Sequence, residues 1–124
     1  MNAPQSPVEL FGLRIAHIGI NTDSPAEADE VAGLFESLMG LEVRHIAPIS
    51  TFAGTLVEVM NNGGRGERGH IGFHVDDLDA AVRWFAARGF EVDESTRTTL
   101  PTGDHLVYFL RPIAGFAIHL TDSE

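Results

Sequence analysis

The sequence predicts an α+β fold built from two tandem βαβββ modules. The first observation is an internal repeat, in which residues 16–20 (AHIGI) match residues 69–73 (GHIGF). The second is that strand-like and helix-like segments follow in the same order after each match. The chain has 124 residues, which is enough for one domain made of two small halves.

A helix is predicted after each matching stretch. Ser24 is expected to cap the first helix, with Pro25 at its first position and Gly40 at its end. Asp76 or Asp77 caps the second, which Gly89 ends. The apolar positions recur at spacings of three and four: Ala28, Val31, Phe35 and Leu38 in the first helix, and Leu78, Ala81, Val82 and Phe85 in the second.

Three strand-like segments follow each helix. They cover about 41–47, 49–53 and 55–60, and then 90–97, 105–110 and 116–120. The predicted organisation is a loose arm over 1–12, a first module over 13–61, a linker over 62–69 and a second module over 70–124, with one domain over 13–121. The polar, glycine-rich linker is expected to be mobile. Each sheet needs cover on the face away from its helix, so the modules are expected to share a cleft.

Composition and charge exclude several classes of function. Hydrophobic residues make up 44% of the chain, which is enough for a core. There is no membrane-length apolar run, no secretory signal and no cysteine, so the cytoplasm is the expected compartment. A net charge of −10 disfavours nucleic acid and leaves a small molecule as the expected partner. A homodimer is expected because open sheets leave edges that pairing would cover.

Four polar residues occupy equivalent strand positions in the two halves. His17 and His70 lie in the matching first strands, and Glu58 and His119 lie in the last strand of each half. Any one of these histidines alone would be assigned a structural role, but symmetric placement of all four favours a shared site. Three imidazoles and one carboxylate suit one divalent transition metal, namely Zn, Ni, Co, Mn or Fe.

Two further residues are expected on the cleft face of the first strands. Because side chains alternate along a strand, Asn21 lies on the side of His17, and His74 lies on the side of His70. Both are candidates for substrate binding, and His74 could also relay a proton or simply line the cleft. His45 and His105 have no counterpart in the other half and are expected at the surface.

The segments AHIGINT, LMGLEV and GHIGFHVDDLDAAVRWFAARGFEV resemble the paired modules of the vicinal oxygen chelate superfamily, which includes glyoxalases, bleomycin-resistance proteins and extradiol dioxygenases. The resemblance covers residues 13–121 and implies that His17, Glu58, His70 and His119 bind the metal. Glyoxalase I-like members have Glu where this chain has His119. A narrower resemblance, through HIGIN, FAG, VEVM, GHI and GFAIHL, is to a small module fused to 2-dehydro-3-deoxyphosphogluconate aldolase.

The resemblance implies a metal-dependent isomerase, epimerase or lyase acting on a small molecule that chelates the metal through adjacent oxygens, such as a 2-oxo or sugar acid. Glu58 is the expected catalytic base and His74 the reserve candidate. Dioxygenase chemistry fits the three-histidine set less well. The alternatives are a metal-free protein that sequesters a cationic drug, which the acidic charge favours, and a non-catalytic accessory module.

Overall fold

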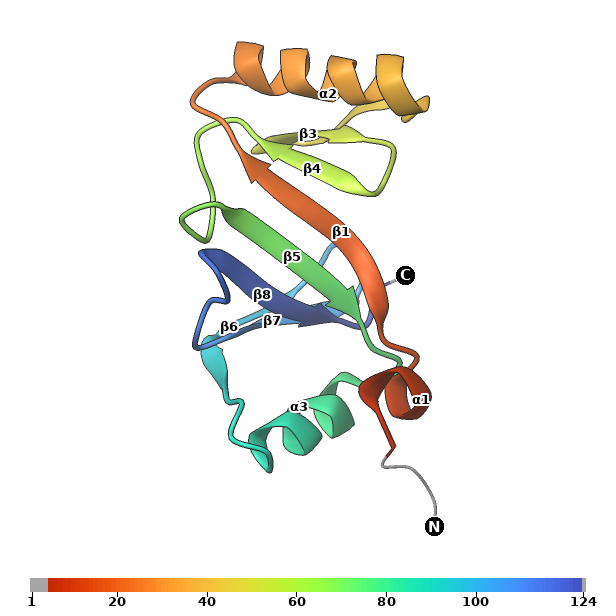
Figure 1. Cartoon of the computed structure of the whole chain (residues 1–124), viewed down its shortest axis with the longest axis vertical. Coiled ribbons are helices and arrows are strands. Elements are labelled where there is room, and N and C mark those ends of the chain that lie inside the picture. The colour runs from red at the N-terminus through yellow and green to blue at the C-terminus, as the bar shows by residue number, and fades with distance from the viewer. Residues whose placement is uncertain (1–4, 124) are drawn as a thin grey trace. The chain divides into compact units, whose positions relative to one another are not determined.

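The computed structural model describes residues 5–123 and has the predicted α+β fold (Figure 1). One short helix, α1 (Pro7–Phe11), precedes two βαβββ sets. The first set is β1 (Arg14–Asn21), α2 (Pro25–Met39), β2 (Val43–Ala47), β3 (Ser50–Ala53) and β4 (Val57–Met60). The second is β5 (Gly69–His74), α3 (Leu78–Ala86), β6 (Val92–Thr99), β7 (His105–Phe109) and β8 (Phe116–Thr121). The strands are hydrogen-bonded in the order β2-β3-β4-β1-β5-β8-β7-β6.

Helix α2 begins and ends where the sequence predicts. The Ser24 hydroxyl oxygen accepts a hydrogen bond from the Glu27 amide at 3.1 Å, and Gly40 ends the helix with a φ of 72°. The expected apolar face is partly wrong, because Leu38 is 76% exposed while Ala32 is fully buried. Leu38 lies at the edge of the stripe, and the small side chains at its centre allow the helix to approach the strands closely.

Helix α3 is capped by Asp77, whose carboxylate accepts from the Ala80 amide at 3.0 Å. It ends at Ala86, before the predicted Gly89, which adopts a φ of 88° in the turn that follows. The predicted face is confirmed, since Leu78 and Ala81 are buried. They pack in one cluster with Val75, Val107 and Leu120.

Two compact units make up the chain, and their limits differ from the two repeats. Within the described residues, we call 17–71 and 113–117 the α2 unit, and 5–16, 72–112 and 118–123 the α3 unit. The boundaries fall within β1, β5 and β8, rather than in the linker at 62–69. The reason is that β1 is hydrogen-bonded between β4 and β5, so a first-repeat strand joins strands of both repeats.

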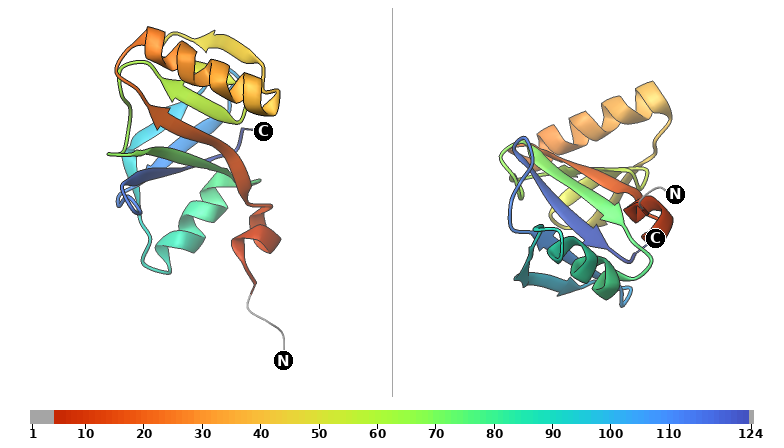
Figure 2. Two further views of the ribbon diagram at one scale, coloured as in Figure 1. Left: turned by 45° about the horizontal axis from the view of Figure 1, so that its top comes forward. Right: turned by 60° about the horizontal axis from the view of Figure 1, so that its bottom comes forward.

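Within the α2 unit, α2 packs against one face of the strands, as both views of Figure 2 show. Ala28 and Ala32 of the helix contact Ala53, Val57 and Val59 of the strands. Side chains alternate along a strand, so the residues between these buried positions point to the opposite face. That opposite face carries the candidate site.

Residues 1–12 were expected to form a loose arm, and the structure corrects this for residues 5–12; residues 1–4 lie outside the described residues. Ser6 caps α1, and Phe11 is only 9% exposed. Phe11 packs in the α3 cluster, and its carbonyl accepts from the Asp76 amide at 2.8 Å. Burial of the aromatic Phe11 side chain stabilises this segment, although the polar residues at its beginning suggest a loose arm.

The linker over 62–69 was expected to be mobile, but the structure holds it at several points. The Gly63 amide donates to the Thr22 carbonyl at 2.7 Å, and the Asn21 amide group donates to the Gly66 carbonyl at 3.0 Å. A side chain on Gly66 would overlap the Gly69 carbonyl. The glycines therefore permit close backbone packing, which a composition-based reading mistakes for flexibility. No helix within residues 5–123 is long and apolar enough to cross a membrane.

We expect Asp29 to stabilise the α2 unit in a pH-dependent way. Hydrogen bonds with His45 and Thr51 lower the pKa of this carboxyl and connect α2 to β2 and β3. A carboxyl group whose pKa is lower in the folded protein than in the unfolded chain adds stability at pH values above the unfolded-state pKa. This stability is lost as the pH falls through the folded-state pKa. Asp29→Asn should therefore lower the urea midpoint at pH 7, with a smaller deficit at pH 3. Glu30→Gln on the same helix is the control, and an equal deficit at both pH values would contradict the assignment.

Candidate metal centre

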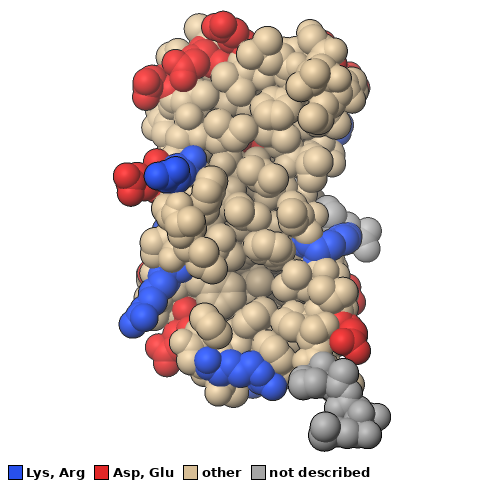
Figure 3. Space-filling model, in the orientation of Figure 1, with Lys and Arg blue, Asp and Glu red and all other residues tan. Residues whose placement is uncertain are grey.

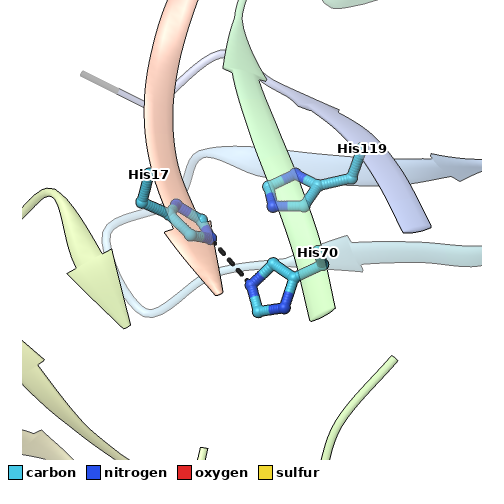
Figure 4. A group of neighbouring side chains, drawn as sticks. All are labelled: His17, His70 and His119. Carbon is cyan, nitrogen blue, oxygen red and sulfur yellow. Dashed lines mark hydrogen bonds between the residues drawn. The ribbon is translucent and has the colours of Figure 1, made fainter. Parts of the chain in front are cut away.

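Three predicted ligands meet within the α2 unit: His17 on β1, Glu58 on β4 and His70 on β5. The His17 Nε2 and His70 Nε2 atoms are 3.1 Å apart, as the dashed line in Figure 4 marks. Glu58 Oε1 lies 3.2 Å from His70 Nε2 and 3.7 Å from His17 Nε2. Two nitrogens and one oxygen thus form a small triangle.

Strand register explains why these residues meet. Strands β1 and β4 are parallel, and Gly19 is the register partner of Glu58. His17 is two residues before Gly19 and so shares its face. A side chain on Gly19 would overlap the imidazole of His70, which lies across the glycine. Gly19 therefore provides the space through which His70 reaches the other two ligands.

A buried serine holds the Glu58 carboxylate in place. The Ser50 hydroxyl donates to Glu58 Oε2 at 2.7 Å, and Ser50 is only 2% exposed. This bond leaves the second oxygen, Oε1, directed at the two histidines. Because Ser50 holds Oε2, the Glu58 carboxylate would offer a metal ion only one ligand atom, Oε1.

Burial and neighbouring groups set the protonation states. Burial acts to raise the pKa of the Glu58 carboxyl, but hydrogen bonds from His70 and Ser50 and attraction to His17 outweigh it, so the pKa is lowered. Burial lowers the pKa of His17, and Glu58 opposes this while His70 adds to it. At neutral pH the triangle therefore holds a carboxylate and a neutral His17.

The triangle fits a divalent transition ion. An ion bound tetrahedrally at about 2.1 Å from each ligand separates its ligand atoms by about 3.4 Å, and octahedral binding separates them by about 3.0 Å. The His17–His70 and Glu58–His70 distances of 3.1 and 3.2 Å lie in that range, and the Glu58–His17 distance of 3.7 Å is slightly longer. Lone pairs directed at one another repel unless a proton or cation lies between them. Imidazole and carboxylate are also the donors that such ions prefer.

The fourth predicted ligand, His119, lies on β8 in the α3 unit. It is 1% exposed and faces Tyr108 of β7, with ring centroids 5.0 Å apart. Figure 4 labels His119 together with the two other histidines that the sequence predicts as ligands, His17 and His70.

The two predicted substrate-binding residues make different contacts. His74 is 6% exposed, and both its ring nitrogens are occupied: Nδ1 lies 2.8 Å from the Ser123 carbonyl and Nε2 lies 2.8 Å from Asp76 Oδ1. In the α2 unit, the Asn21 side chain donates to the linker, as described above, and its buried Oδ1 makes no hydrogen bond with residues 5–123. His45 and His105 have side chains 65% and 44% exposed, in line with the expected surface positions.

Sequence reasoning missed two residues that shape the centre. The sequence could have indicated the role of Gly19, because a glycine inside a strand often marks a close approach of another group. The sequence could not have indicated the role of Ser50, because its contact with Glu58 depends on the pairing of β3 with β4.

No protein-family model matches the chain, and no curated protein matches it. Solved structures do. A hypothetical protein from Bacillus halodurans aligns with a TM-score of 0.62 at 13% identity, and the alignment covers 90% of this chain and 95% of the Bacillus protein. A methylmalonyl-CoA epimerase variant from Streptomyces coelicolor aligns with a TM-score of 0.62 at 18% identity, covering 87% and 95%. The methylmalonyl-CoA epimerase from Mycobacterium tuberculosis gives 0.62 at 17% identity, covering 86% and 85%.

These likenesses establish the fold. It is the vicinal oxygen chelate fold, as the resemblance of the sequence implied. At 13–18% identity the likeness extends to the fold alone, because one fold can carry many activities.

We predict that Gly19→Ala destabilises the protein through the ring of His70. The added methyl group overlaps that ring, and such overpacking costs about 1–3 kcal/mol. Urea unfolding should show this loss in the wild-type background and a much smaller one in a His70→Ala background, where the ring is absent. Gly33→Ala on α2 is the control, because its new methyl group would meet no atom within 4 Å. Equal losses in both backgrounds would show that Gly19 does not act through His70.

Proposed function

We propose that this chain is a metal-dependent enzyme of the isomerase, epimerase or lyase type. The single observation that carries the proposal is the triangle of His17 Nε2, His70 Nε2 and Glu58 Oε1. It supplies the donors for one divalent ion and leaves further coordination positions open to a small molecule. The proposed substrate chelates the metal through two adjacent oxygens, as a 2-oxo or sugar acid can.

His119 is proposed as the fourth ligand. Its position in the last strand of the second repeat, equivalent to that of Glu58 in the first, supports this, as does the deep burial of an imidazole that metal binding would explain. The ion is proposed to be Zn, Ni, Co, Mn or Fe. When bound, it would act as a Lewis acid that polarises a carbonyl oxygen of the substrate.

Glu58 is proposed as the base that takes a proton from carbon next to that carbonyl. Its carboxylate is ionised at neutral pH because hydrogen bonds from His70 and Ser50 outweigh the effect of burial and keep its pKa low. Ser50 keeps Oε2 occupied, so Oε1 is the atom that would leave the metal and accept the proton. His74 is the second candidate, but it would first have to release Asp76 or Ser123 to expose a nitrogen.

The structural neighbours support this type of chemistry. Several are methylmalonyl-CoA epimerases, solved with methylmalonyl-CoA or with 2-nitronate-propionyl-CoA. An epimerase must remove and return a proton at carbon, which requires a positioned base. The same reaction type and a small-molecule ligand are proposed for this chain.

Two other functions remain as alternatives to catalysis. The net charge of −10 favours sequestration of a cationic drug, which would need no metal. The narrower resemblance to an aldolase-fused module, carried by Phe52-Ala53-Gly54 and by the VEVM and GFAIHL segments, favours an accessory role. Metal content and turnover by the isolated chain separate all three.

We expect purified protein to bind one divalent ion per chain, and Glu58→Gln to separate metal binding from turnover. The amide is nearly isosteric, so the fold and most of the metal affinity should persist. Turnover should fall about 10²–10⁴-fold, the usual contribution of a positioned base. The measurements are metal analysis and activity screens on 2-oxo acids, sugar acids and hemithioacetals.

His119→Ala is the matched control, because it removes a proposed ligand and no base. Its activity should recover in part when metal is added in excess, whereas Glu58→Gln should not recover. Wild-type turnover by Glu58→Gln at full metal occupancy would exclude Glu58 as the base. Failure of the wild type to bind any divalent ion would exclude the enzyme as proposed.

We also propose that the chain forms a homodimer. Charged side chains are sparse over the strands in the view of Figure 3, and an acidic chain can associate with its own copy only where charges do not repel. Sedimentation equilibrium at micromolar protein should therefore give twice the chain mass of 13.4 kDa. A single species at the chain mass would disprove the dimer.

A further inference from the structure

A row of aligned side chains extends from the candidate metal centre across the α2 unit. Glu58 on β4 pairs with Phe52 on β3, and Phe52 pairs with Arg44 on β2. Register partners in neighbouring strands lie on the same face of a sheet. The row Arg44–Phe52–Glu58 therefore faces away from α2, on the same side as His17.

Independent contacts confirm this orientation. The neighbours of the row along the strands, Val43, Ala53 and Val57, pack in the cluster with α2. His45, next to Arg44, contacts Asp29 of α2. Since neighbouring residues on both sides point to the helix, Arg44 must point to the opposite face.

Arg44 stands out by its charge. It is the only Arg or Lys in β2, β3 and β4, in a chain with net charge −10. It is exposed, and within residues 5–123 it forms no salt bridge. An arginine that is not neutralised by one of 18 acidic residues is available to a ligand.

Phe52 fills the space between the centre and Arg44. Its ring lies 6.4 Å from the ring of His17, centroid to centroid, at an interplanar angle of 68°. An aromatic ring in this position offers apolar contact to a short carbon chain. Strands are about 4.8 Å apart, so the strand of Arg44 lies about 10 Å from that of Glu58.

We propose that Arg44 and Phe52 form a subsite for a carboxylate at the far end of the substrate. The substrate class is then a small acid with chelating oxygens at one end, a short carbon chain over Phe52 and a carboxylate bound by the guanidinium of Arg44. A guanidinium binds a carboxylate through two parallel hydrogen bonds. A single cation balances a monoanion, and the acidic surroundings oppose a phosphate dianion. This inference rests on the proposed function, because the chelating end needs the metal.

The test compares two probes that differ only at the far end. 2-Oxoadipate and 2-oxohexanoate share the same six-carbon chain and chelating group, and only the first carries a second carboxylate. Isothermal titration of the metal-loaded protein should show that 2-oxoadipate binds about tenfold more tightly, as one charge-assisted hydrogen-bonded pair predicts. Arg44→Gln should abolish this preference while leaving 2-oxohexanoate binding unchanged. Arg14→Gln, an exposed arginine of β1 in the α3 unit, should preserve it.

The outcomes separate this inference from the proposed function. Equal binding of both probes by the wild type, or a preference that survives Arg44→Gln, would overturn the subsite and leave the metal site standing. If neither probe binds, the subsite is wrong as proposed, and a metal titration of the same sample shows whether the metal site fails with it.

Discussion

The candidate centre depends on one partly buried carboxylate that lies close to two imidazole rings. Glu58 would be costly to bury alone, and hydrogen bonds from Ser50 and His70 offset that cost. The same contacts direct one oxygen toward His17, so the requirement for stability and the requirement for metal binding are met by one arrangement. This coupling explains why the carboxylate is tolerated in a strand whose neighbours, Val57 and Val59, pack against a helix.

Much of this arrangement could be predicted from the sequence. The repeat located His17, Glu58 and His70 on strands, and alternation placed them opposite the helix. The helix caps at Ser24 and Asp77 were also predictable, because capping needs only local residues. The unpredicted parts depend on contacts distant in the sequence. Ser50 meets Glu58 through the pairing of β3 with β4, the linker is fixed by backbone approach rather than by composition, and α1 is held by the burial of Phe11.

Glycines in this chain permit close packing, whereas a high glycine content would suggest flexibility. At Gly19 and Gly66, the missing side chain makes room for an imidazole ring and for a carbonyl group. Such positions are constrained by shape and tolerate substitution poorly, although they lie in segments that look permissive.

The acidic surface has a separate effect, which concerns charge rather than packing. It leaves Arg44 as an isolated positive charge on its strands, and that isolation is what gives the residue its proposed role.

The division of β1, β5 and β8 between the two units bears on how the two halves of the chain fold. Each unit takes strand residues from both halves of the sequence, so neither half alone contains a complete unit. A chain carrying a single βαβββ repeat could complete such a unit only by exchanging strand segments with another copy. The two halves of this polypeptide are therefore expected to fold together rather than as separate pieces.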